Sequence, residues 1–196
     1  PRPTPRGRAD AVATSDPPYR RRVIDVAAVP PSPARPATLA RRFAALAYES
    51  LLLAAVVLIT GFVALPLVTP AQAGALTVPG LPQRVFLFCL VFAVLAAYFT
   101  WTWSAGRRTL PMKTWRLELV QAADGAPLRP RSALMRYLAT WIGPSLALAA
   151  YGALQPFELG EHAAWLVGLN FLWAFVDPGR QFLHDRIAGT QIVIRV

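Results

Sequence analysis

The chain has 196 residues, of which 55% are hydrophobic and 15% charged, and its net charge is +10. Soluble domains carry about 25% charged residues, so the composition excludes an ordinary soluble domain and indicates an integral membrane protein. The arginines cluster beside hydrophobic runs, where membrane topology and anionic headgroups explain them, so the charge does not indicate nucleic-acid binding.

Residues 1–38 form the first segment and include nine prolines and the triplet RRR at 20–22. Proline removes backbone donors, and the segment has too few apolar residues to offset the entropy lost on ordering. We therefore expect a disordered basic tail in the cytoplasm. A solvated tail that only sets topology is favoured over one that contacts anionic lipid or a partner.

Residues 39–196 are expected to form an all-α membrane domain with four transmembrane helices. An apolar run of about 20 residues is long enough to cross the ~30 Å hydrocarbon core. Prolines end the first run, Gly143-Pro144 predicts a kink in the third, and the fourth reaches sufficient length only if it begins near Leu159. The predicted spans are 43–67, 85–104, 134–154 and 160–176.

Two polar segments lie outside these spans. Residues 105–133 contain an alternating stretch, LELVQ at 117–121, followed by Asp124-Gly125, which is typical of a tight turn. We expect a short β-hairpin on the membrane face. The C-terminal segment 177–196 ends in a second alternating stretch, which could pair with that hairpin.

The distribution of basic residues predicts the orientation. The chain carries nine before the first span and at its start, seven in the middle segment counted over residues 105–136 and three in the C-terminal segment, while the two remaining loops hold only Arg84 between them. By the positive-inside rule, both termini and the middle segment are cytoplasmic.

Glu49 is the strongest candidate functional residue, because a carboxylate in a membrane helix marks a pathway or needs a partner. Arg42 lies seven residues earlier, about two helical turns, and so shares its face. Two interpretations carry equal weight: a carboxylate that exchanges a proton for a cation, and a fixed ion pair of Glu49 with Arg42 or Arg136 that locks helices together.

The run His184-Asp185-Arg186 is the second candidate. Neighbouring residues on a helix do not face one another, so a single catalytic cluster is not expected. A structural role is favoured over ion handling: Asp185 either caps or pairs with an arginine of the middle segment such as Arg107 or Arg108. No metal site is expected, because His162 and His184 are assigned to opposite membrane faces.

Two further polar residues lie in or beside the fourth span. Asn170 is polar at membrane depth, and an interhelical hydrogen bond is favoured over a role in lining a cavity. Asp177 follows the span, where we expect it to be well solvated and to end the helix or pair with Arg180.

Three motifs resemble the RDD family of bacterial integral membrane proteins, which is named for one arginine and two aspartates. They are RRFAALAYE at 41–49, GRRTLPMKTWRLELVQAADGAPL at 106–128 and DPGRQFLHDRIAGTQIVI at 177–194. On this resemblance, Arg42 matches the arginine and Asp185 an aspartate, while Glu49 stands where aspartate is usual. The resemblance implies a location in the bacterial inner membrane, and transport, including sodium–proton antiport, has been proposed for some members.

These observations leave two hypotheses for the function. The first is a proton-linked transporter or cation antiporter component that handles protons and monovalent cations and forms a homo-oligomer or joins a membrane partner. The second is a non-transporting scaffold that binds a partner or anionic lipid through its basic face. No enzyme motif is found, so neither catalysis nor a cofactor is expected.

Overall fold

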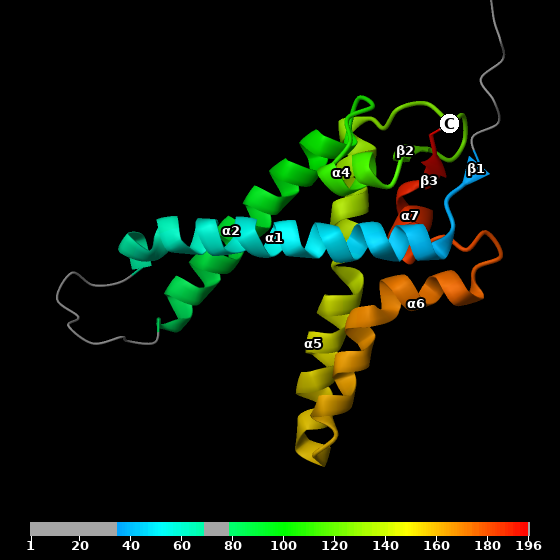
Figure 1. Ribbon diagram of the computed structural model, residues 1–196. Coiled ribbons are helices and arrows are strands. Elements are labelled where there is room, and N and C mark those ends of the chain that lie inside the picture. The colour runs from blue at the N-terminus through cyan, green and yellow to red at the C-terminus, as the bar shows by residue number, and fades with distance from the viewer. Residues whose placement is uncertain (1–34, 69–78, 196) are drawn as a thin grey trace, which may run out of the picture. The chain divides into compact units, whose positions relative to one another are not determined.

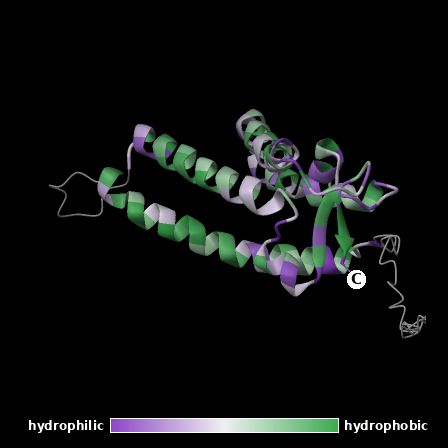
Figure 2. Ribbon diagram, turned by 90° about the horizontal axis from the view of Figure 1, so that it is seen from above, coloured by the Kyte–Doolittle hydropathy of each residue, from purple (hydrophilic) through white to green (hydrophobic). Residues whose placement is uncertain are grey.

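Two long apolar helices, α1 (Leu39–Val68) and α2 (Leu81–Trp103), are the largest elements of the computed structural model, which describes residues 35–68 and 79–195. Figure 2 shows hydrophobic residues around most of both helices. In each helix, only 11% of the most apolar 18-residue stretch is buried. A helix that is apolar all round and unburied differs from the core helix of a soluble protein, so both are candidate membrane spans.

The first two predicted spans therefore match α1 and α2. Helix α1 continues through Pro66, which we expected to be near its end. Helix α2 begins four residues before the predicted start, with Pro82 in its first turn. A proline is tolerated there because the first N–H groups of a helix have no partner within it.

The last two predicted spans are broken helices. The third is divided between α4 (Pro130–Thr140) and α5 (Ile142–Leu154). The fourth is divided between η2 (Gly160–Gly168), a 3₁₀ helix, and α6 (Leu169–Val176). A short 3₁₀ turn, η1 (Gln155–Phe157), connects α5 to η2. Among the described residues, four continuous spanning helices are not present, and α5 alone is only about 20 Å long at 1.5 Å per residue.

The break between α4 and α5 lies at Trp141, slightly before the predicted kink. Pro144 lacks the N–H that would reach the carbonyl of Thr140 in a continuous helix. At Gly143, a Cβ atom would lie 2.8 Å from the carbonyl oxygens of both Leu166 and Val167. A glycine at this position thus lets α5 lie directly against η2, and the two run side by side in Figure 1.

A three-stranded antiparallel sheet of order β1-β3-β2 covers one end of these helices. Strand β2 (Leu117–Gln121) pairs with β3 (Thr190–Ile194), and Leu119 lies opposite Ile192. The predicted pairing of the C-terminal stretch with residues 117–121 is confirmed. The predicted hairpin is formed only in part. After the turn, a single antiparallel bridge from Val120 to Pro127 takes the place of a second strand.

Strand β1 (Arg35–Pro36) was not expected, because these residues belong to the predicted disordered tail. It pairs with β3, and the N–H of Ala37 donates to the carbonyl of Ile192 at 3.0 Å. Residues 1–34 of that predicted tail lie outside the described residues.

Two short helices complete the fold, α3 (Leu110–Thr114) and α7 (Leu183–Ala188). Gly189 follows α7 with a φ of +63°, a left-handed conformation that glycine adopts without steric cost and that turns the chain into β3. The core lies where the sheet meets the ends of the helices and contains Leu117, Leu119 and Phe99. This core surrounds the site described next.

Candidate functional site

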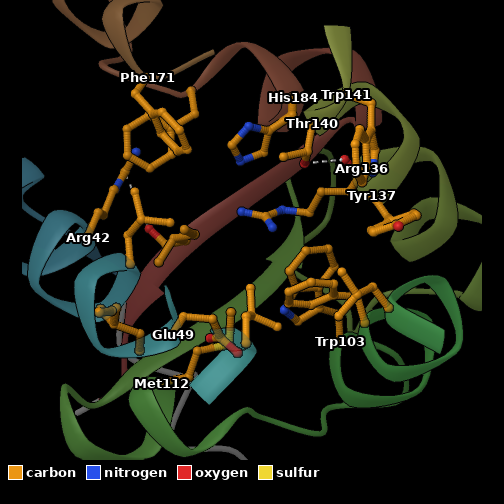
Figure 3. A pocket seen from close by; sticks show the side chains of 18 of the residues that line it. Arg42, Glu49, Trp103, Met112, Arg136, Tyr137, Thr140, Trp141, Phe171 and His184 are labelled. Atoms are coloured by element: carbon orange, nitrogen blue, oxygen red, sulfur yellow. Dashed lines mark hydrogen bonds between the residues drawn. The ribbon is translucent and has the colours of Figure 1, made fainter. Parts of the chain in front are cut away.

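A cavity of about 260 Å³ lies between α1, α2, α4, α7 and the sheet. Aliphatic and aromatic side chains form most of its wall. Polar side chains also line it, and they include Arg42, Glu49, Arg136 and His184. Figure 3 shows these four side chains around the cavity, contributed by three different helices. The structure thus brings Arg136 and His184 close to Arg42 and Glu49, although the two pairs lie far apart in the sequence.

Arg136 forms a buried ion pair with Asp185. Its Nε lies 2.8 Å from Asp185 Oδ1, and the side chains are 5% and 0% exposed. Thr190 Oγ1 donates to the same oxygen at 3.1 Å, and the guanidinium lies over the ring of Trp103, 4.4 Å from its centroid. Asp185 therefore pairs with an arginine, as predicted, but that arginine is not Arg107.

Arg107 and Arg108, the two examples named for this pairing, form no ion pair with Asp185 among the described residues, and Arg136 of the same segment (105–136) does. Arg107 donates to the carbonyl of Trp101 and to Ser104 Oγ, and stacks over the Trp101 ring. These are local contacts, six residues or fewer along the chain. Arg136 was considered only as a partner of Glu49, and nothing in the sequence singled it out for Asp185.

Arg42 connects α1 by hydrogen bonds to two segments that are distant in the sequence. Its Nη1 donates to the carbonyl of Arg180 at 2.9 Å, and its Nη2 lies 3.5 Å from the carbonyl of Ile192. The guanidinium also faces the ring of Phe182, 6.0 Å away. Arg42 has no carboxylate partner among the described residues, so the predicted ion pair with Glu49 is wrong.

Glu49 is held by two hydroxyl groups. Its Oε2 accepts a hydrogen bond from Thr109 Oγ1 at 2.7 Å, and its Oε1 accepts one from Tyr98 Oη at 3.3 Å. Only 8% of Glu49 is exposed. Within the described part of the chain it forms no ion pair, so the predicted pair with Arg136 is also wrong. The hydrogen bond from Tyr98 to Glu49 was not anticipated from the sequence.

His184 packs its imidazole between Phe171 and Phe182, with ring centroids 6.0 and 5.5 Å away. Its Nε2 lies 3.9 Å from Asp185 Oδ1. Burial lowers the pKa of His184 to about 4, although the neighbouring carboxylate acts in the opposite direction. The ring is therefore neutral at pH 7.

Asp177 is buried, not well solvated as predicted. Its Oδ2 accepts a hydrogen bond from the N–H of Gln181 at 3.0 Å, and its Oδ1 lies 3.3 Å from Arg186 Nε. The partner is thus Arg186 and not Arg180, whose carbonyl instead accepts from Arg42. The carboxylate organises the turn between α6 and α7, which supports the cavity wall.

Asn170 makes the interhelical hydrogen bond expected of it. Its Nδ2 donates to the carbonyl of Thr140 at 2.6 Å. This carbonyl belongs to the last residue of α4, the one that Pro144 cannot satisfy. Asn170 therefore joins α6 to the break between α4 and α5.

The arrangement can bind a polar group in an apolar setting. Within residues 35–68 and 79–195, no group of three or more His, Cys, Asp or Glu residues could hold a metal ion. The cavity instead combines one carboxylate that has neutral partners with two buried guanidinium groups. Such a combination suits a proton or an anion better than a cation, because the guanidinium charges repel cations.

Comparison with known proteins agrees with the three motifs. The model of the RDD family matches residues 36–189, which include Arg42, Glu49, Arg136 and Asp185. The chain matches no curated protein and no solved structure. The resemblance seen in the sequence is thus confirmed over most of its expected extent. The chain belongs to the RDD family.

Proposed function

We propose that this chain is an integral protein of the bacterial inner membrane and a component of a proton-linked transporter. The support for the membrane location is the pair α1 and α2, about 45 and 35 Å long at 1.5 Å per residue, against a hydrocarbon core of ~30 Å. Both helices expose apolar side chains along most of their length.

The proposed topology has four crossings and places both termini in the cytoplasm. It rests on the distribution of basic residues, and in it α4–α5 and η2–α6 form the third and fourth crossings. Single cysteines introduced by Gly125→Cys and Glu158→Cys, in a Cys89→Ser background, test it. We expect a membrane-impermeant maleimide to label position 158 in intact cells and position 125 only after permeabilisation. The reverse pattern contradicts the topology.

The observation that carries the transport proposal is the environment of Glu49. Both of its partners, Tyr98 and Thr109, are hydroxyl groups, and a hydroxyl can donate or accept. The two hydrogen bonds can therefore persist whether Glu49 is ionised or protonated. A carboxylate fixed by an arginine would lose its ion pair on protonation. Glu49 is thus suited to take up and release a proton at the edge of the cavity.

Proteoliposomes that contain a trapped pH dye test this role. Sodium, potassium, lithium or an organic anion is added outside, and the internal pH is followed for the wild type and for Glu49→Gln. We expect a solute-dependent pH change in the wild type and none in Glu49→Gln. Glu118→Gln is the matched control, because Glu118 lies in β2, outside the cavity. Equal pH changes in all three proteins would show that Glu49 carries no transported proton.

A basic groove favours the second candidate function, a membrane scaffold. The exposed residues Arg41, Arg116 and Arg195 line this groove together with Trp115. Such a surface suits anionic headgroups or an acidic partner. If no solute moves the pH in proteoliposomes, and replacing these arginines by glutamine removes binding to vesicles that contain phosphatidylglycerol, the scaffold replaces the transporter. The proposal assigns neither catalysis nor a cofactor.

A further inference from the structure

The cavity contains more hydrogen-bond donors than the protein satisfies. Arg136 donates only from Nε, to Asp185, and neither of its Nη atoms bonds to a described residue. Figure 3 shows the guanidinium of Arg136 extending into the cavity from α4. Two further buried donors have no acceptor in the described part of the chain, Arg42 Nε and Trp103 Nε1. These three side chains are 4%, 3% and 6% exposed.

Buried polar groups in native proteins almost always have partners. Among the described residues, the buried groups without one include two acceptors, Asp185 Oδ2 and Asn170 Oδ1. The unpaired donors of Arg42, Arg136 and Trp103 come from three helices, two of these side chains are positively charged, and all three line one cavity. We propose that Arg136, Arg42 and Trp103 bind the carboxylate of a small amphipathic monoanion whose apolar part fills the rest of the cavity.

The charges around the cavity indicate a single negative charge on the ligand. Asp185 offsets the guanidinium of Arg136, whereas Arg42 is bonded only to backbone carbonyls. When Glu49 carries a proton, Arg42, Arg136 and Asp185 together contribute one positive charge, which one carboxylate neutralises. A dianion would leave an unpaired negative charge in an apolar site, which is costly.

The wall of the cavity indicates an apolar body for the ligand. Six aromatic rings line it, namely those of Phe99, Trp103, Tyr137, Trp141, Phe171 and Phe182. Ligand sites are typically lined in this way, with a few convergent polar groups that fix orientation. A volume of about 260 Å³ suits a single short chain or one ring system and not a two-chain phospholipid.

A carboxylate of this kind has two sources, the bilayer and the aqueous phase. The claim that the transporter moves this monoanion rests on the function proposed above. The claim that the cavity binds it does not, because binding is measured at equilibrium without flux. Flux that is driven by an inorganic cation, without carboxylate binding, would overturn this inference and leave the transporter standing.

Isothermal titration of the full chain in nanodiscs of neutral lipid tests the inference. The probes are octanoate, representing a bilayer-derived chain, 2-naphthoate, representing a water-soluble ring, and octanamide and octylammonium as uncharged and cationic analogues. We expect octanoate or 2-naphthoate to bind at least tenfold more tightly than both analogues, and the tighter of the two indicates the source. If neither octanoate nor 2-naphthoate binds more tightly than octanamide, the proposal is overturned.

Two variants locate the binding to the cavity. Trp103→Phe retains the ring and removes the donor, and we expect it to weaken carboxylate binding about tenfold. Trp101→Phe is the matched control, since Trp101 is exposed on the same helix, and it should not alter binding. Arg42→Gln should weaken binding further, with folding checked by circular dichroism. If Trp103→Phe and Arg42→Gln both bind octanoate and 2-naphthoate as the wild type does, the assigned donors are wrong.

Discussion

Arg136 and Asp185, 49 residues apart in the chain, form an ion pair of 2.8 Å in which both side chains are buried. The pair joins α4 to α7, and Thr190 at the start of β3 donates to the same carboxylate oxygen. A single side chain thus connects the helical part of the chain to the sheet. Because water is excluded there, neither charge can be removed without leaving the other unpaired.

Asp185→Asn should therefore be strongly destabilising. The variant leaves the guanidinium of Arg136 buried without a counter-charge, and breaking such pairs costs about 3–5 kcal/mol. Glu118→Gln is the control, because its contact with Arg195 is 3.9 Å long and the two side chains are 24% and 56% exposed, and pairs that water reaches contribute at most about 1 kcal/mol. Denaturant titration in detergent micelles measures both free energies of unfolding. Similar losses in the two variants would contradict a structural role for the buried pair.

His184 should make the stability depend on pH. Burial lowers its pKa to about 4 in the folded chain, against an ordinary value of about 6.5. Between these values the unfolded chain binds a proton that the folded chain does not, so stability falls as pH falls from about 6.5 to 4. The full loss is about 3 kcal/mol at 1.4 kcal/mol per pKa unit.

His184→Phe should remove this part of the pH dependence, because phenylalanine fits the aromatic surroundings and does not titrate. The measurement is the free energy of unfolding at pH 7 and pH 4.5 for both proteins. We expect the difference between the two pH values to be smaller in the variant. An unchanged difference would mean that His184 binds protons equally in the folded and unfolded chains.

The sequence predicted the parts of this fold that depend on composition. Long apolar runs identify α1 and α2, because the hydrocarbon core requires length and hydropathy and little else. Alternation identified β2 and β3, since a sheet with one buried face needs period-two patterning. Arg42, Glu49 and Asp185 were singled out from the sequence as candidates for ion pairing or transport, and all three are buried in the structure.

The partners themselves could not be predicted. Glu49 binds two hydroxyl groups, from Tyr98 and Thr109, and neither side chain differs in sequence from an ordinary interfacial tyrosine or a helix cap. Strand β1 has only two residues and includes a proline, so no local pattern marks it. Its pairing depends on β3, more than 150 residues later in the chain. Contacts of this range follow from the fold and not from local sequence.

Gly143 should tolerate no side chain. A Cβ atom there would lie 2.8 Å from two backbone carbonyl oxygens of η2, which cannot move without separating the helices. We expect Gly143→Ala to cost about 1–3 kcal/mol. Gly152→Ala on the same helix is the control, because nothing lies within 4 Å of its Cβ position. That variant should gain about 0.5–1 kcal/mol from lower chain entropy, and the same sign of effect in both would contradict the close packing of α5 on η2.

Asn170 and Pro144 should be coupled in stability. Asn170 Nδ2 donates to the Thr140 carbonyl at 2.6 Å, which Pro144 leaves without its helical donor. Asn170→Ala should therefore cost about 1–3 kcal/mol, because the carbonyl loses its partner. In a Pro144→Ala background, the new N–H at position 144 can reach the same carbonyl, so the cost of Asn170→Ala should be smaller. A double-mutant cycle of unfolding free energies measures the coupling, and two additive losses would show that Asn170 does not replace the donor that proline removes.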